Sequence, residues 1–265
     1  MFIDSHCHLN YKGLVEQQAD VIARARGAGV DAMLNISTRQ SEWDAVVAVA
    51  EREPDVWASI GIHPHEADGH ADVDTHKLLE RAEHPRVVAI GETGLDYYYD
   101  HSDRDQQQTS FRAHIAASRQ TGLPLIVHTR SAEEDTATIL TEEMTAGVFS
   151  GVIHCFTATD AFAEIALNLG FYISISGIVT FKNAKALQST AARVPSERLL
   201  IETDSPFLAP VPHRGKPCEP AFVADTARFL ANIRGIDVED LAHVTSTNFR
   251  TLFSKASVPR SSRAI

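Results

Sequence analysis

The sequence has few cysteines and no long apolar run, and each absence argues against a class of protein. The three cysteines, Cys7, Cys155 and Cys218, show no repeated spacing, which argues against a disulfide framework and favours a reducing compartment. We interpret them as small buried side chains. No segment approaches the roughly 20 apolar residues of a membrane span, and the first ten residues lack the basic and apolar regions of a signal peptide. We therefore expect a cytoplasmic protein without membrane association.

Basic residues are also scarce. The chain has 24 Lys and Arg against 35 Asp and Glu, a formal net charge of -11. Long-range repulsion then disfavours a protein that coats duplex nucleic acid. A short phosphate contact is still compatible with this charge, especially beside bound cations.

Two catalytic motifs are missing as well: a Gly-x-Ser-x-Gly nucleophile elbow and a Gly-Lys phosphate-binding loop. No Pro/Gly/Ser-rich linker divides the 265 residues, of which 44% are apolar, so one large core is possible. We expect a single domain over residues 1–265, with a polar tail at 254–265 that frays.

Short apolar, β-branched runs alternate with amphipathic segments along the chain. The runs cover residues 2–7, 30–36, 56–62, 86–90, 125–127, 151–153, 171–175 and 199–201. Such runs are typical of strands buried on both faces. Between them we expect helices, one of them capped by Ser102, running to Thr121 and stopped by Gly122. Two more helical stretches, 222–230 and 241–253, follow the last run.

Eight strands alternating with helices predict an α/β fold, a TIM (β/α)8 barrel. The alternative is an open doubly wound sheet. That fold usually carries a glycine-rich first turn, whereas the first run here ends in His-Cys-His.

Side chains that bind metals stand where the apolar runs end. The predicted ligands are His6, His8, Glu92, His128, His154 and Asp204. In a barrel the carboxyl ends of all strands meet at one mouth. A single histidine at a strand end is usually a packed residue, but so many together with two carboxylates predict a site for two divalent cations.

Two of these residues are also predicted to be catalytic. Glu92 is placed to bridge the two ions, with His6 and His8 on the first and His128 and His154 on the second. Asp204 is placed to complete the first site and to orient a water or take its proton. Paired ions lie about 3.5–4 Å apart and lower the pKa of bound water toward about 7. The alternative for Asp204 is capping a helix.

Further residues are candidates for substrate binding. His63 could be a ligand, a phosphate contact or a packed residue, and we favour a substrate contact. The predicted lip of the mouth carries several cations and aromatic rings: Arg130, Lys182, His213, Arg214, Lys216, Tyr97, Tyr98, Tyr99, Phe156 and Phe207. From this set we assign Arg130, Arg214 and Tyr97 to substrate binding, because cations suit an anionic substrate and bases stack on aromatic rings.

At these residues the sequence resembles the TatD family of metal-dependent deoxyribonucleases, and most closely its YcfH-like branch. The matching stretches are Asp4-Ser-His-Cys-His-Leu9, Gly61-Ile-His-Pro64, Gly91-Glu-Thr-Gly-Leu-Asp-Tyr97, Val127-His-Thr-Arg130, His154-Cys-Phe-Thr157, Gly177-Ile-Val-Thr-Phe181, Glu202-Thr-Asp-Ser-Pro206 and Pro212-His-Arg-Gly-Lys216. The resemblance implies an amidohydrolase-type barrel, the same six ligands, and hydrolysis of DNA, often from single-stranded 3′ ends, with magnesium or manganese. One departure is Cys218, where the family usually carries Asn.

The identity of the metal and of the substrate stays open at this level. Four histidines favour zinc or manganese, whereas magnesium prefers oxygen ligands. The same site could hydrolyse a small phosphoester, lactone or amide, or belong to a non-catalytic metal-binding scaffold. We expect DNA, single-stranded or with frayed ends, as the partner, and no obligate protein partner.

Overall fold

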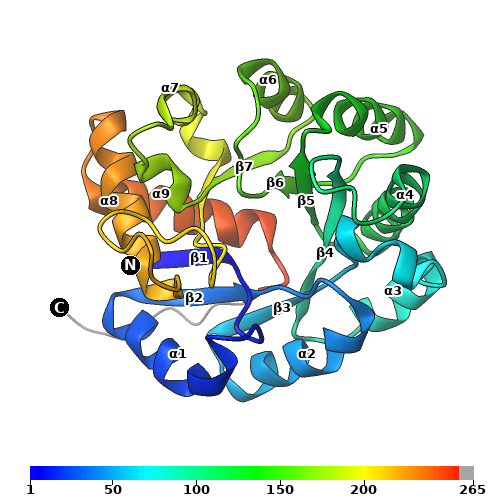
Figure 1. Ribbon diagram of the computed structural model, residues 1–265, viewed down its shortest axis with the longest axis horizontal. Helices are drawn as coiled ribbons and strands as arrows, with labels where there is room; N and C mark the ends of the chain where they lie inside the picture. Colours follow the sequence, from blue (N-terminus) through cyan, green and yellow to red (C-terminus); the bar gives the residue numbers. More distant parts are fainter. Residues whose placement is uncertain (257–265) are drawn as a thin grey trace.

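The computed structural model describes residues 1–256, in which eight parallel strands alternate with helices around a barrel (Figure 1). The strands are β1 (Phe2–Cys7), β2 (Val30–Asn35), β3 (Val56–Ile60), β4 (Val87–Asp96), β5 (Leu125–Arg130), β6 (Gly151–Ile153), β7 (Tyr172–Ile175) and β8 (Leu199–Ile201). The longer helices are α1 (Gln18–Gly27), α2 (Trp43–Arg52), α3 (Thr75–Ala82), α4 (Arg104–Thr121), α5 (Glu133–Ala146), α6 (Asp160–Asn168), α7 (Lys185–Arg193), α8 (Val223–Arg234) and α9 (Val238–Leu252). Strand order follows the chain from β1 to β8. The predicted barrel is confirmed, and the open doubly wound sheet is wrong.

The barrel closes between β8 and β1 at the residues expected to bind metal. The His8 amide donates to the Ser205 carbonyl at 2.8 Å, and the Asp204 amide donates to the His6 carbonyl at 2.9 Å. The Ser5 hydroxyl adds a bond to the Ile201 carbonyl at 3.0 Å. Closure therefore holds the segment after β8 against the His-Cys-His stretch at the end of β1.

Side chains alternate between two buried layers, as the two-residue period of a strand requires. One layer packs the outside of the strands against the surrounding helices. The other joins a residue from every strand to Phe249, Leu252 and Phe253 at the end of α9. The Asn248 side chain donates to the Leu199 carbonyl, at the start of β8. Thus α9 lies at the amino ends of the strands (Figure 1), and the opposite end is left for the site.

The start of one helix differs from the expectation. Ser102 does not cap α4, because the Asp103 carboxylate accepts from the amides at the helix start. Gly122 ends α4 in the left-handed conformation, with φ 70°, as predicted. At the beginning of the expected tail, Lys255 donates to two backbone carbonyls and Ala256 is buried. Residues 257–265 of that tail lie outside the described residues. Within residues 1–256, no helix has the combined length and apolar character required to cross a bilayer.

A buried histidine ties α4 to the end of β3 and makes stability depend on pH. His114 donates to the Ser110 carbonyl at 2.7 Å and accepts from the Ile62 amide at 3.0 Å, so its imidazole is neutral. Burial lowers its pKa from 6.5 to about 4. Below pH 6.5 this imidazole binds a proton in the unfolded chain, whereas in the folded protein it stays neutral until the pH approaches 4. The free energy of unfolding therefore falls as the pH falls toward 4.

On going from pH 7.5 to pH 5, we expect this imidazole to lower the free energy of unfolding by roughly 2 kcal/mol. Urea unfolding of the wild type and of His114→Gln at both pH values measures it. Glutamine keeps an acceptor but does not titrate, so the variant should lose less stability on acidification. An equal loss in both proteins would contradict the assignment.

Candidate metal centre

The first group of candidate ligands lies where β1 meets the segment after β8. His6 Nε2 is 3.2 Å from Glu92 Oε2 and 3.7 Å from Asp204 Oδ1. His8 Nε2 is 3.8 Å from the same Glu92 oxygen and 3.3 Å from the same Asp204 oxygen. Residues i and i+2 of a strand share a face, and both imidazoles point inward together, as predicted for this pair.

The second group surrounds the other oxygen of Glu92. From Glu92 Oε1 the distances are 2.8 Å to His154 Nε2, 3.2 Å to His128 Nδ1 and 3.5 Å to His63 Nε2. One carboxylate thus faces two histidine clusters, which touch each other where His6 stacks on His154. The structure brings all six predicted ligands together and adds His63 to the candidates for the second group.

The spacing and chemistry of these atoms fit divalent cations. Donors about 2.0–2.1 Å from a tetrahedral ion lie about 3.3 Å from one another, close to most of the separations above. The buried His6 Nε2 lies 3.2 Å from Glu92 Oε2 but lacks hydrogen-bond geometry, as expected for a nitrogen directed at an ion. Nitrogen-rich sets with few carboxylates favour zinc or manganese over magnesium.

The carboxylates are held in the charged form that metal binding requires. Burial alone would raise the pKa of Glu92, but the imidazoles of His154, His63 and His6 hold it well below its usual range. Burial also opposes ionisation of Asp204, and there His8 and His6 keep the pKa low. The floor of the site therefore carries two negative charges, one on the buried Glu92 and one on the partly buried Asp204.

Close backbone packing brings Glu92 into this position. The expectation that Glu92 and His128 follow their strands is wrong, because β4 continues to Asp96 and β5 to Arg130. A side chain at Gly94 (φ 136°) would place its Cβ 2.0 Å from the His128 carbonyl oxygen. The register between β4 and β5 shifts between Ile90 and Thr93, and such irregularities often redirect side chains at active sites.

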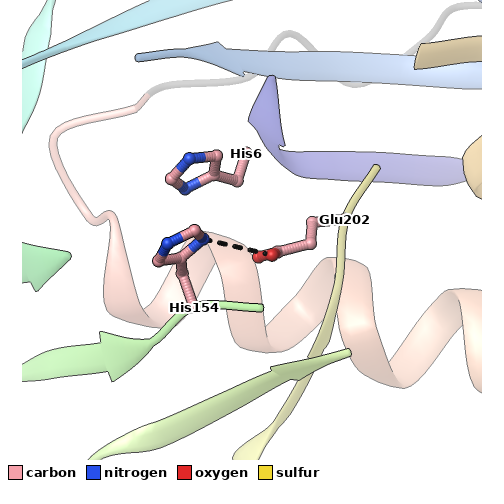
Figure 2. Close-up of side chains that lie close together, drawn as sticks. All are labelled: His6, His154 and Glu202. Atoms are coloured by element: carbon pink, nitrogen blue, oxygen red, sulfur yellow. Dashed lines mark hydrogen bonds and ion pairs between the residues drawn. The ribbon is translucent and has the colours of Figure 1, made fainter. Parts of the chain in front are cut away.

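Two further carboxylates, to which we assigned no role from the sequence, orient the histidines. Glu202 Oε1 lies 3.3 Å from His154 Nδ1 and accepts from the Cys155 amide at 2.7 Å. Figure 2 shows this carboxylate beside the His154 ring, which stacks on His6 at 3.9 Å. Such carboxylates fix the tautomer and raise the basicity of a ligand. The alternation of strand residues offered a clue, since Glu202 stands two residues before Asp204.

The second orienting carboxylate is Asp96. Its Oδ2 lies 3.1 Å from His128 Nε2 and 2.9 Å from His65 Nε2. His128 Nδ1 is thereby directed at Glu92. Asp96 follows Glu92 by four residues, so the same strand alternation pointed to it.

The loop after β8 has a strained backbone at the site. Asp204 adopts φ 57°, a conformation rare for residues other than glycine. Such strain is typical of functional sites. The alternative of Asp204 as a helix cap is wrong, since the next helical segment begins at Pro220.

A pocket of about 660 Å³ opens above the ligands, and Arg130 lines it. The guanidinium carbon lies 4.2 Å from the Tyr98 ring centre and 4.6 Å from that of Tyr99. Among the described residues, Arg130 has no carboxylate within ion-pair distance, whereas Arg39, also on the pocket wall, is neutralised by two glutamates. Arg130 is therefore a free cation beside the metal centre.

Other residues expected at the lip lie elsewhere. The Tyr97 hydroxyl donates to Asp135 on α5 at 2.8 Å, so Tyr97 points away from the pocket, and Tyr99 lines it instead. Arg214 stacks on Phe181 at 3.8 Å, outside the pocket lining. Four more residues have other surroundings: His213 contacts Asp225 and Phe222, Phe156 is buried, and Lys182 and Lys216 are exposed.

The cysteines make ordinary contacts. Cys7 and Cys218 are fully buried, and Cys155 is partly buried. All three are free thiols. The interpretation as small buried side chains holds for Cys7 and Cys218.

His63→Ala is expected to weaken turnover more than it lowers metal content. His63 is the most distant member of its cluster, and its Nδ1 accepts from the His65 amide. We expect a loss of roughly 10–100-fold in kcat/KM, the range for residues that support a metal centre. Rates and metal content by mass spectrometry test this, with the exposed His76→Ala as control. Loss of an ion with His63 would instead make it a ligand.

A parallel barrel with histidine and carboxylate clusters at the carboxyl ends of its strands defines the class of metal-dependent barrel hydrolases. The model of the family described as TatD related DNase matches residues 3–254, so the chain belongs to this family.

Relatives and solved structures agree with this assignment. The chain is 46% identical over 254 residues to the uncharacterized metal-dependent hydrolase YcfH of Escherichia coli K12, covering 95% of each chain. It is 37% identical over 240 residues to the protein named 3'-5' ssDNA/RNA exonuclease TatD of Erwinia tasmaniensis, covering 88% of this chain and 92% of that one. The crystal structure of the TatD homologue YJJV from Escherichia coli superposes with a TM-score of 0.89 at 29% identity, covering 96% of this chain and 98% of that chain. The protein is a metal-dependent hydrolase of the TatD family.

Proposed function

We propose that this hydrolase is a deoxyribonuclease that removes nucleotides from single-stranded or frayed 3′ ends of DNA, using two divalent cations. One observation carries the proposal: the two oxygens of Glu92 face two histidine clusters on the floor of one pocket. Two-cation sites serve in-line displacement at phosphorus. The relative named as an exonuclease supports the choice of substrate.

The proposed ligands are His6, His8 and Asp204 for one ion and His128 and His154 for the other, with Glu92 shared. Cations bound there would supply Lewis-acid activation of a water and of the phosphoryl oxygens. The test compares magnesium, manganese and zinc.

The protein's own residues then have separate tasks. Asp204 is ionised, lies 3.3 Å from His8 Nε2, and accepts the proton of the attacking water at its carboxylate. Arg130 holds a phosphate oxygen of the substrate at the pocket wall, because a stacked guanidinium directs its N–H groups outward. His63 remains a proposed substrate contact beside the second cluster, and Arg214 and Tyr97 have no supporting position in the pocket.

The test uses a single-stranded oligonucleotide labelled at its 5′ end, with magnesium, manganese or zinc and with chelator. We expect stepwise shortening from the 3′ end that chelator abolishes. A blocked 3′ end should stop the reaction. Absence of cleavage with all three ions would refute the proposal.

Hydrolysis of a small ester is the second candidate, since the net charge of -11 disfavours a long polyanion. Competition between the oligonucleotide and a small phosphodiester separates the two. Faster turnover of the small ester, with no inhibition by DNA, would favour the second candidate.

A further inference from the structure

The pocket above the metal centre has two chemically different walls. One wall is formed from the loops after β2, β3 and β4 and from the end of β5, and it is polar: Arg39, His65, Glu66, Tyr99 and Arg130 line it. The other comes from the loops after β1, β7 and β8 and is largely apolar: Tyr11, Ile178, Phe207 and Leu208 line it. In a barrel whose strand order follows the chain, these two groups of loops lie on opposite sides of the mouth.

The apolar wall is a packed surface. Phe207 lies nearly perpendicular to Tyr11, with ring centres 6.0 Å apart at 85°. Tyr11 in turn stacks on the candidate ligand His8 at 4.5 Å. The Leu208 backbone oxygen fits against Gly177, where an added Cβ would lie only 2.4 Å away. The wall is thus continuous from the ligand His8 to the loop after β7.

Phe207 presents its ring to the pocket and is held there by the backbone. Its amide donates to the Asp204 carbonyl at 2.9 Å, and Leu208 has φ 56°, a strained value for leucine. The side chain is nevertheless 49% exposed while it lines the pocket. A large aromatic ring kept accessible three residues from a ligand is placed for contact with substrate.

We propose that this apolar wall, with Phe207 at its centre, binds the unpaired base of the terminal nucleotide. This inference rests on the proposed nuclease function. A phosphate gains nothing from an aromatic surface, whereas every base offers a flat face that stacks on one. With Arg130 opposite, a nucleotide spans the pocket with its base on the apolar wall and a phosphate oxygen on the polar one.

The size of the pocket sets the condition that the base be unpaired. Its volume of about 660 Å³ falls in the range of roughly 300–1,000 Å³ typical of pockets that enclose one small ligand. A terminal base must leave its partner to enter such a space, as enzymes acting on a base within a duplex require. Selection for single-stranded or frayed ends then resides in this wall.

The experiment compares two oligonucleotides that differ only in the 3′-terminal nucleotide, which is either normal or abasic. For the wild type we expect KM to be about tenfold lower with the normal end. Phe207→Ala should raise KM about tenfold on the normal end and leave the abasic end unchanged. Phe207→Leu should fall between the two, because it keeps apolar area and loses the aromatic face.

Val211→Ala is the matched control. Val211 is also 49% exposed on the same loop but does not line the pocket, so both substrates should behave as with the wild type. An equal effect of Phe207→Ala on both ends, or no effect on either, would refute the base-binding wall while the nuclease stands. No cleavage of either strand by the wild type would refute the nuclease, and the wall with it.

Discussion

Glu92→Ala is expected to lower kcat/KM by roughly 10³-fold or more, because several kcal/mol of transition-state stabilisation leave with the ions. Glu92 is the only residue whose two oxygens contact both clusters within the described site. Without it, the two histidine clusters no longer share a carboxylate. Metal content measured by mass spectrometry should fall together with the rate.

The fold should survive this change. Glu92 is surrounded by imidazoles that a folded barrel positions independently, from β1, β5 and β6. Circular dichroism and the midpoint of urea unfolding test whether the fold survives. Any loss of stability is limited, because the substitution also removes a negative charge that repels the neighbouring Asp204. Glu164→Ala is the control, since Glu164 is exposed on α6 and does not line the pocket. Wild-type activity in Glu92→Ala would show that the proposed site is wrong.

Asp204→Asn is expected to lower kcat by about 10²–10⁴-fold, the contribution of a well-placed general base. Asparagine has nearly the same shape and keeps an oxygen toward His8, but it cannot accept a proton. Asp204 is ionised in the wild type because His8 and His6 hold its pKa down against burial. Because asparagine keeps an oxygen toward His8, metal content should change less than the rate.

Asp204→Ala separates the two roles assigned to this residue. Alanine removes both the ligand oxygen and the proton acceptor, so the ion near His6 and His8 should be lost as well. The measurements are kcat over a range of pH and metal content for both variants. An Asn variant with wild-type kcat would assign proton transfer to another group.

Much of the site could be predicted from the sequence because strand ends have a simple local signature. Apolar runs followed by a histidine or carboxylate place ligands at one end of a parallel barrel, and this placement does not depend on the positions of the helices. His6 and His8 needed only the two-residue period of a strand. The metal-dependent hydrolase class followed from these positions together with the matching motifs.

The aromatic residues after β4 show where that reasoning stops. Three consecutive tyrosines carry equal weight in the sequence, yet Tyr97 turns to Asp135 and only Tyr99 lines the pocket. Where the strand ends, the alternation of side chains ends too, and the direction of each ring depends on its neighbours in space. Here Arg130, which lines the pocket, stacks on the rings of Tyr98 and Tyr99 and so helps to set their direction.

The sequence by itself determined the eight strands, their parallel order and the six residues that meet at the mouth, because period and polarity are local properties of the chain. The sequence also predicted that Glu92 lies between the two groups of histidines, but only the tertiary structure decided that Glu92 lies inside β4 and not after it. The tertiary structure also decided that Asp96 and Glu202 orient His128 and His154. These features depend on the shift in register between β4 and β5 and on contacts between distant segments, and neither leaves a periodic trace in the sequence.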